Sequence, residues 1–298
     1  MWTIKVEGDA MKSGLIIKSI SGDYKVITEN NEEFVCKPRG LFRHMEETPK
    51  VGDLVDFDEK TKIILKIHPR KNELYRPIIA NLDKVFLTFS VKEPDLNLNL
   101  LDRLLSIVEY NDINIVIVFT KLDLLDDKTE FEKILYYYKS LGYTIYTSGF
   151  GLPYEEIMDE VNDNICCFAG QSGVGKSTLL NFFDHTLNLK TAEISEALGR
   201  GKHTTRHTEL LRVGTGWVAD TPGFGNVDFP FEDLLTLSHT FTEFFKNSDQ
   251  CKYRLCLHLD EPDCEIKRLF ESGGIIGSRY QNYQQFAGEL KEKQKYKY

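Results

Sequence analysis

The sequence contains no long apolar run, which excludes the simplest classes of membrane protein. A helix that spans a bilayer needs about 20 consecutive apolar residues, and no stretch of the chain approaches that length. The first eight residues also lack the apolar segment of a secretory signal. We therefore expect a cytoplasmic protein with no membrane partner.

The chain also lacks net positive charge, and its cysteines are not expected to form disulfides. The six cysteines should stay reduced in the cytoplasm, so a disulfide-stapled fold is excluded. The formal net charge of -9 argues against nucleic-acid binding by the surface as a whole, because affinity for phosphate comes from Lys and Arg. Positive charge is nevertheless concentrated in residues 60–76, with six Lys or Arg against one Glu, and in 200–207. Either run fits a solvated surface as well as an RNA contact.

Strand and helix patterns predict a multi-domain protein of three parts. Residues 1–68 show short strands between Gly, Asn and Asp turns, which predicts a small β-barrel. An OB-type barrel is favoured because that fold commonly binds oligonucleotides, although an SH3-like barrel fits the same strand count. Residues 69–228 alternate strands and helices, which predicts an α/β domain with a covered parallel sheet. Residues 229–298 are expected to be helical around a cysteine-rich loop, with one helix over 231–247.

A phosphate-binding loop is predicted at residues 170–177. They read Gly-Gln-Ser-Gly-Val-Gly-Lys-Ser, follow an apolar strand and precede a helical pattern. Backbone N–H groups and the helix dipole bind phosphate in that context. We expect Lys176 to reach the β- and γ-phosphates and act in catalysis, and Ser177 to bind Mg²⁺. The predicted phosphate contacts are Gly170, Gln171, Ser172, Gly173, Val174, Gly175, Lys176, Ser177 and Thr178.

Two segments that precede the phosphate loop are predicted to bind guanine. Thr120-Lys-Leu-Asp123 is similar to the guanine-reading Asn-Lys-x-Asp loop, with Thr120 in place of Asn. The Asp123 carboxylate can accept two hydrogen bonds from guanine, a pair that adenine cannot offer, and the stem of Lys121 can pack on the base. Without the Asn amide, we expect the loop to be held less firmly. Ser148 lies in a second short loop expected over the base.

Two segments that follow the phosphate loop are predicted to respond to the γ-phosphate. Asp220-Thr-Pro-Gly223 matches the Asp-x-x-Gly loop of GTPases, so Asp220 should hold Mg²⁺ and the Gly223 amide should contact the γ-phosphate. Thr204 or Thr205 could supply a further Mg²⁺ ligand, and we predict that Thr205 is this ligand. Phe224 replaces the Gln that orients water in Ras-like proteins. His203 is therefore the candidate catalytic residue, with an RNA contact or a solvent-facing ring as alternatives.

The order of these motifs is unusual. In ordinary GTPases the phosphate loop comes first and the base-reading loops last, whereas here residues 120–123 and 147–149 precede residue 170. Because the site of a parallel sheet lies at the carboxyl ends of its strands, rotated connectivity can build the same site. The sequence therefore predicts a circularly permuted P-loop GTPase domain. Its Asp-x-x-Gly loop would lead directly into the C-terminal region and could pass on a nucleotide-dependent movement.

A metal site is predicted after this domain. Cys251, Cys256, His258 and Cys264 offer three thiolates and an imidazole within a short loop. This set suits one tetrahedral, structural Zn²⁺ ion, and buried free cysteines are the alternative. Four protein ligands would close the site, so no catalysis is expected there. The predicted cofactors are this zinc and the Mg²⁺ that accompanies GTP.

Taken together, these residues resemble the ribosome-small-subunit-dependent GTPase A family, also called RsgA, YjeQ or YloQ. The most specific features are the permuted order and the cysteine loop, together with three segments and the phosphate loop. Those segments are Leu98-Asn-Leu-Leu-Asp-Arg103, Gly201-Lys-His-Thr-Thr205 and Asp220-Thr-Pro-Gly-Phe224. The resemblance implies an OB barrel, a permuted GTPase domain and a zinc-binding helical domain. It also implies that His203 is catalytic, and that the protein binds the small ribosomal subunit and its ribosomal RNA, assists its late maturation and hydrolyses GTP faster on it.

Other functions remain open at this point. Another permuted ribosome-assembly GTPase is one, although such relatives usually lack a cysteine cluster after the Asp-x-x-Gly loop. A nucleotide-switched RNA-binding module, in which hydrolysis only resets the state, is a second. A P-loop ATPase or kinase is a third. A monomer is expected.

Overall fold

The structure is a computed structural model that describes residues 11–43, 48–75, 77–149, 154–171, 173–174, 176, 208–220 and 228–295. These residues form two compact units. The first unit contains the described residues up to 84, together with 154–168 and 208–220. The second contains residues 85–149, the described residues of 169–176, and 228–295.

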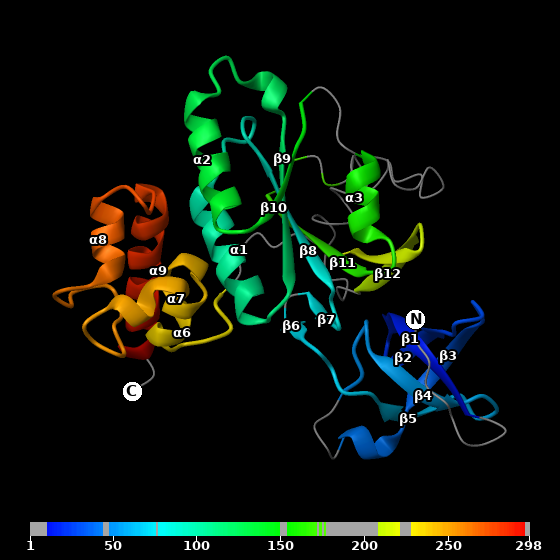
Figure 1. Cartoon of the computed structure of the whole chain (residues 1–298). Coiled ribbons are helices and arrows are strands. Elements are labelled where there is room, and N and C mark those ends of the chain that lie inside the picture. Colours follow the sequence, from blue (N-terminus) through cyan, green and yellow to red (C-terminus); the bar gives the residue numbers. More distant parts are fainter. Residues whose placement is uncertain are drawn as a thin grey trace. The chain divides into compact units, whose positions relative to one another are not determined.

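The N-terminal part of the first unit is a closed five-stranded barrel (Figure 1). Its strands are β1 (Met11–Ile20), β2 (Asp23–Ile27), β3 (Glu33–Pro38), β4 (Leu54–Asp58) and β5 (Ile63–Ile67). They pair in the order β1-β2-β3-β5-β4, and β4 closes on β1. All pairs are antiparallel except β3–β5. This closed Greek-key order confirms the OB-type barrel and removes the ambiguity left by the strand count.

Local sequence explains how the barrel strands approach one another. Ser21 and Gly22 both have positive φ, as a two-residue hairpin between β1 and β2 requires. Gly14 lies where a Cβ atom would come within 2.7 Å of the carbonyl oxygen of Ile27, so a side chain would push β1 and β2 apart. The barrel interior is filled by side chains that are completely buried: Ile16, Val26, Cys36, Val55, Phe57 and Ile64. A short 3₁₀ helix (Gly40–Arg43) and a hairpin of β6 (Glu73–Tyr75) and β7 (Ile78–Ala80) follow the barrel strands.

The remainder of the first unit is built from α3 (Tyr154–Val161), β11 (Ile165–Gly170), β12 (Glu209–Val213) and β13 (Gly216–Asp220). Strand β11 runs parallel to β13, and β12 pairs antiparallel with β13. All residues of β11 are buried, as expected for a parallel strand covered on both faces. Its last two residues belong to the second unit, where the phosphate loop begins.

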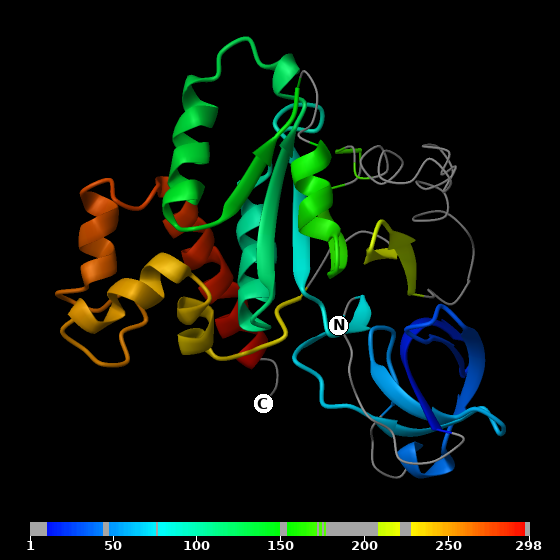
Figure 2. The same cartoon turned by 45° about the vertical axis from the view of Figure 1, so that its right-hand side comes forward.

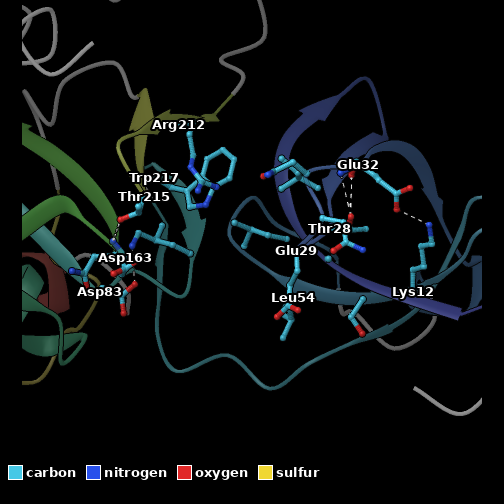
Figure 3. A pocket seen from close by; sticks show the side chains of 18 of the residues that line it. Lys12, Thr28, Glu29, Glu32, Leu54, Asp83, Asp163, Arg212, Thr215 and Trp217 are labelled. Carbon is cyan, nitrogen blue, oxygen red and sulfur yellow. Dashed lines mark hydrogen bonds and ion pairs between the residues drawn. The ribbon is translucent and has the colours of Figure 1, made fainter. Parts of the chain in front are cut away.

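A polar cavity of about 650 Å³ lies within the first unit (Figure 3). Barrel side chains such as Lys12, Thr28 and Glu32 line it, as do Arg212 and Trp217. Most of its polar groups have partners: Lys12 forms an ion pair with Glu32, and the Arg212 guanidinium lies over the Trp217 ring. None of the residues predicted to contact nucleotide is among the described residues that line it.

The second unit contains the base-binding half of the predicted GTPase domain. Its parallel strands are β8 (Lys84–Ser90), β9 (Asn114–Thr120) and β10 (Thr144–Thr147). Helices α1 (Leu98–Tyr110) and α2 (Thr129–Ser140) lie on the same side of these strands (Figures 1 and 2). The Asn97 side chain caps α1 by accepting from the backbone N–H of Leu100. The carboxyl ends of β9 and β10 carry the two predicted base loops.

Four helices form the C-terminal part of the second unit, next to α1 (Figure 2). They are α6 (Leu234–His239), α7 (Thr242–Asn247), α8 (Glu265–Glu271) and α9 (Gly277–Lys295), with a 3₁₀ turn at Ser248–Gln250. The helix predicted over 231–247 is two short helices. The chain breaks at Phe241, which is extended and places its buried ring against Phe244 and Tyr283. Among the helices that the structure describes, none has the length and apolar character needed to cross a membrane.

A buried charge network joins helix α9 to α1, α2 and α7. The fully buried Arg279 of α9 donates to Asp102 Oδ1 of α1 at 2.7 Å and to Glu243 Oε1 of α7 at 2.9 Å. Tyr138 of α2 and Asn282 of α9 also donate to Asp102, at 2.6 and 2.7 Å. Asp102 thus accepts hydrogen bonds from α2 and from α9, and the network holds the C-terminal helices against α1 and α2 within the second unit.

Candidate functional site

The phosphate loop starts at Gly170, where only glycine fits. Its φ of 135° is unfavourable for other residues, and a Cβ atom would lie 1.9 Å from the carbonyl oxygen of Thr88 on β8. Gly173 also has positive φ, and Val174 is completely buried. The chain can therefore turn tightly at the end of β11, which is where a phosphate-binding loop must turn.

Lys176 is held against this loop. Its ammonium donates to the carbonyl oxygens of Gly170, at 2.9 Å, and of Gln171. Burial lowers the pKa of Lys176 to about 8, because a charged ammonium loses hydration there. The ammonium is still mostly charged at pH 7, and phosphate oxygens would strengthen that preference. Gln171 has a buried side-chain oxygen with no hydrogen-bond partner among the described residues.

The base-reading loop turns sharply at the end of β9. Lys121 adopts the left-handed conformation, with φ 62° and ψ 36°, and a short 3₁₀ turn (Leu122–Leu124) follows. The Lys121 ammonium donates to the carbonyl oxygen of Glu93, and this hydrogen bond holds the end of the Lys121 side chain in place. Asp123 is exposed, and its carboxylate is accessible to a ligand.

The second base loop packs against the first. The backbone N–H of Leu122 donates to the carbonyl oxygen of Ser148 at 2.9 Å, and the Ser148 N–H donates to that of Phe119 at 2.8 Å. A Cβ atom at Gly149 would lie 2.7 Å from the backbone nitrogen of Asp123. Gly149 thus permits the close approach of the two loops. The sequence places Gly149 in the predicted loop at 147–149 but does not indicate this packing role.

A hydrogen bond joins the base-reading loop to the phosphate loop. The Thr120 hydroxyl lies 2.7 Å from the carbonyl oxygen of Val174 and 3.4 Å from that of Phe89. Thr120 is only 7% exposed, so this bond is shielded from water. We expected a loop held less firmly without the Asn amide, but the shorter hydroxyl of Thr120 makes a buried link of its own.

The described residues include part of the predicted nucleotide site. In the second unit, the loops that contain Thr120, Lys121, Asp123 and Ser148 lie at strand ends, and Thr120 contacts the phosphate loop. Asp220 is the last residue of β13 in the first unit, and its side chain is outside the described part. Several other predicted residues lie wholly outside the described residues: Ser172, Gly175, Ser177, Thr178, His203, Thr204, Thr205, Gly223 and Phe224.

The four predicted metal ligands come together in the second unit. One donor atom from each of Cys251, Cys256, His258 and Cys264 lies within 4.8 Å of the other three, and this cluster could hold a metal ion. His258 Nδ1 is 3.6 Å from Cys251 Sγ and 3.3 Å from Cys264 Sγ. Burial lowers the pKa of His258 to about 4. The imidazole is therefore neutral at pH 7, the form in which histidine binds metals.

The surrounding loop is organised around these ligands. The Glu261 carboxylate accepts from the backbone N–H groups of Leu257 and Leu259, at 2.7 and 3.0 Å. Two α9 hydroxyls hold the loop from the other side: Tyr280 donates to the carbonyl oxygen of His258 at 2.8 Å, and Tyr283 donates to that of Leu257. Helix α9 therefore contacts the loop of the Cys/His cluster and contains Arg279 of the buried network.

The basic run at 60–76 is not a continuous patch of free charge. Arg70 binds the buried Asp53 through two nitrogens, at 2.7 and 2.8 Å, and Lys71 forms an ion pair with Asp83. Lys62 lies over the Phe34 ring at 4.1 Å, and Arg76 is outside the described residues. Counting charges along the sequence therefore overestimated the charge that this run offers to a partner.

Two protein-family models together match most of the chain. The RsgA GTPase family model matches residues 67–230, and the RsgA N-terminal domain model matches residues 13–63. The chain is 46% identical over 290 residues to the small ribosomal subunit biogenesis GTPase RsgA of Geobacillus sp. (strain WCH70). That match covers 95% of this chain and 99% of the relative. The protein of the same name from Bacillus subtilis (strain 168) is 42% identical over 294 residues, with 95% and 99% covered.

Two solved structures have the same fold over nearly the whole chain. The crystal structure of YloQ, a circularly permuted GTPase, matches with a TM-score of 0.80 and 36% identity, and covers 98% of this chain and 99% of that one. The crystal structure of YjeQ from Thermotoga maritima matches with a TM-score of 0.79 and 33% identity, and covers 94% and 98%. These matches confirm the permuted fold that the motif order predicts. The chain belongs to the RsgA GTPase family.

Proposed function

We propose that this protein hydrolyses GTP on the small ribosomal subunit, assists late maturation of that subunit, and is stimulated by it. The observation that carries the proposal is the hydrogen bond from Thr120 to Val174, which joins a base loop to a phosphate loop in permuted order. The names of relatives that match nearly the full chain support the choice of the small subunit as the partner.

The proposed roles of the site residues follow GTPase chemistry. Asp123 would read the base, and Ser148 and Lys121 would pack around it. Lys176 would neutralise charge on the β- and γ-phosphates. Ser177, Thr205 and Asp220 would hold Mg²⁺, and the Gly223 amide would contact the γ-phosphate. His203 would orient or deprotonate the attacking water.

The test is GTP hydrolysis measured with and without purified small ribosomal subunits, with large subunits as the control. We expect only small subunits to accelerate turnover. His203→Ala should lower the stimulated rate by roughly 10²-fold without weakening GTP binding, because a group acting only in the transition state leaves ground-state affinity unchanged. His207→Ala, from the same segment, should retain stimulation. If subunits bind in a nucleotide-dependent way but leave hydrolysis unchanged, the protein is a nucleotide-switched RNA-binding module instead.

We propose that the cluster at Cys251, Cys256, His258 and Cys264 binds one structural Zn²⁺. Zn–S and Zn–N bonds of about 2.3 and 2.0 Å place the donors of a tetrahedral site roughly 3.5–4 Å apart. The separations of 3.3 and 3.6 Å from His258 Nδ1 to two of the sulfurs are close to that spacing. A ligand set of three thiolates and one imidazole selects zinc over Mg²⁺ or Ca²⁺, which prefer oxygen.

Loss of one ligand should remove the metal and loosen the C-terminal part. We expect one zinc per chain in protein purified without chelator, and well under one in Cys256→Ala. Structural zinc mainly drives local folding, so proteolysis should reach 228–295 in this variant while GDP affinity changes by only a few-fold. Cys36→Ala, which removes an equally buried thiol from the barrel, should keep its zinc. Full zinc content in Cys256→Ala would contradict the ligand set.

The barrel is the proposed surface for ribosomal RNA. Phe34 of β3 carries the ammonium groups of Lys12 and Lys62 over its ring, at 5.0 and 4.1 Å. Aromatic rings and positive charge together are what OB barrels use to bind single-stranded nucleic acid. We also propose that the protein is a cytoplasmic monomer. Its proposed domains are residues 1–68, 69–228 and 229–298.

A further inference from the structure

His258 has an unusual backbone conformation for a residue of the Cys/His cluster. Its φ is 58°, in the left-handed region that residues other than glycine adopt uncommonly. The residue is only 1% exposed, and its Nδ1 atom lies close to two of the sulfurs of the cluster. Because local backbone preference does not favour this conformation, contacts from elsewhere in the loop must hold the imidazole in place.

Glu261 holds the backbone on both sides of His258. Its Oε1 atom accepts from the N–H group of Leu257 at 2.7 Å, and its Oε2 atom accepts from that of Leu259 at 3.0 Å. The first N–H belongs to the peptide unit that follows Cys256, and the second belongs to the peptide unit that follows His258. One carboxylate therefore fixes the peptide unit that comes directly after each of two proposed ligands.

Helix α9 supports the same turn through weaker contacts. Tyr280 donates to the carbonyl oxygen of His258 at 2.8 Å, and Tyr283 donates to that of Leu257. Each hydroxyl holds one carbonyl group through a neutral hydrogen bond. Glu261 instead makes two hydrogen bonds as a charged acceptor, and bonds to charged groups contribute more to stability than neutral ones. Loss of the Glu261 carboxylate should therefore free the ligands more than loss of either hydroxyl.

We propose that Glu261 is a positioning residue that holds Cys256 and His258 ready for the metal ion. This inference rests on the proposed zinc site. Ligands that are already in their bound arrangement lose less conformational freedom when the metal binds. Groups that orient metal ligands in this way typically contribute roughly 10- to 100-fold to metal affinity. An amide in place of the carboxylate has one acceptor oxygen and a donor NH₂ group, so it cannot accept from both N–H groups.

The test compares zinc affinity in Glu261→Gln with that in the matched control Asp263→Asn. Asp263 lies in the same loop, directly before Cys264, but its side chain is 67% exposed and forms an ion pair with Lys252. Its backbone is also left-handed, with φ 54°, which asparagine tolerates. Both substitutions remove one negative charge, so the control corrects for simple attraction between the loop and Zn²⁺. Competition with a chelating dye at pH 7 would measure Zn²⁺ affinity in the full chain.

Two further measurements separate positioning from a purely structural role. The absorption spectrum of the Co²⁺-loaded protein reports which side chains bind the metal. Proteolysis of 228–295 at saturating Zn²⁺ reports whether the C-terminal part still folds. In Glu261→Gln we expect the unaltered Co²⁺ spectrum and full protection from protease, because the four ligands are still present and excess metal can order them.

Glu261→Gln should weaken Zn²⁺ binding roughly 10- to 100-fold. Asp263→Asn should weaken it by less than about threefold, since an exposed charge is screened by solvent. Unchanged affinity in Glu261→Gln, or equal weakening in both variants, would overturn the inference alone. So would a Glu261→Gln chain that protease still cleaves at saturating Zn²⁺, because the carboxylate would then be required for folding itself. Absence of zinc from the unsubstituted protein would overturn the proposed zinc site and this inference together.

Discussion

Asp123→Asn is expected to reverse the base preference of the protein from guanine to xanthine nucleotides. The carboxylate can accept hydrogen bonds from both N1–H and the 2-amino group of guanine, whereas an amide directs an N–H group against that amino group. Losing these charge-assisted bonds should weaken GTP binding by roughly 10²–10³-fold. Xanthine carries a carbonyl oxygen at C2, which accepts from the amide, so XTP should become the better ligand.

Competition between GTP, XTP and ATP for the protein would measure this reversal. The exposure of Asp123 matters here, because the substitution is not expected to disturb the fold. Asp126→Asn is the control: its carboxylate lies three residues further along and is fully exposed, so the same chemical change should leave base preference unaltered. A variant at Asp123 that still prefers GTP to XTP would show that another group reads the base.

Arg279→Met should be the most destabilising single change in the C-terminal helices. Arg279 is completely buried between Asp102 and Glu243, and its guanidinium lies 4.1 Å from the centre of the Phe241 ring. Methionine fills most of the volume but leaves two carboxylates buried without their counterion. Breaking a buried pair in this way costs about 3–5 kcal/mol of folding free energy.

The pH dependence of that loss identifies its cause. Burial raises the pKa of Asp102, and the charge of Arg279 only partly offsets this. Burial also acts to raise the pKa of Glu243, but the charge and hydrogen bonds of Arg279 help to outweigh it and leave that pKa lowered. In Arg279→Met both pKa values should rise above their unfolded values. The folded state then binds more protons than the unfolded state, so stability falls as pH increases above about 4. The variant should therefore be less impaired at pH 5 than at pH 7.

Urea unfolding at both pH values would measure the loss of stability in Arg279→Met. Because a protein with two compact units need not unfold in one step, amide hydrogen exchange would be used to follow α9 separately. Arg103→Met is the matched control. Arg103 also joins α1 to α9, through Glu289 at 2.6 Å, but that pair is partly exposed. Arg103→Met should therefore lower the folding stability by only about 1 kcal/mol. Equal losses of unfolding free energy in the two variants would mean that packing, and not the buried charges, holds α9 against α1.

The buried network also bears on how nucleotide state could reach the C-terminal part. The motif order suggested that the Asp-x-x-Gly loop passes its movement directly into that region. The helices of that region, however, share a compact unit with β8, β9, β10 and the phosphate loop. Helix α9 joins the metal loop, through Tyr280 and Tyr283, to α1 at Asp102. The Cys/His cluster is thus tied to the part of the domain that carries the proposed base-reading loops.

Local sequence patterns were enough to predict the broad organisation of this protein and its candidate sites. The glycine pattern at 170–175, the order of the motifs and the spacing of Cys251 to Cys264 are local features, and each depends on what neighbouring residues can do together. The strand preceding residue 170 was also predictable, because a strand buried on both faces is a continuous apolar run. These local signals were enough to identify the permuted fold and the candidate ligands.

Contacts between distant residues could not be predicted from these local patterns, because they depend on how the whole chain packs. Strand order and the parallel β3–β5 pair separate an OB-type barrel from its alternatives, and no local pattern encodes that pairing. Charges counted along 60–76 are partly neutralised by Asp53 and Asp83, which lie outside the run. Thr120 looked like a weakened motif, yet its hydroxyl reaches a carbonyl 54 residues away. Nothing in the local sequence distinguishes Arg279 from the other polar residues of its helix. Its burial with Asp102 and Glu243 follows only from the packing of the chain.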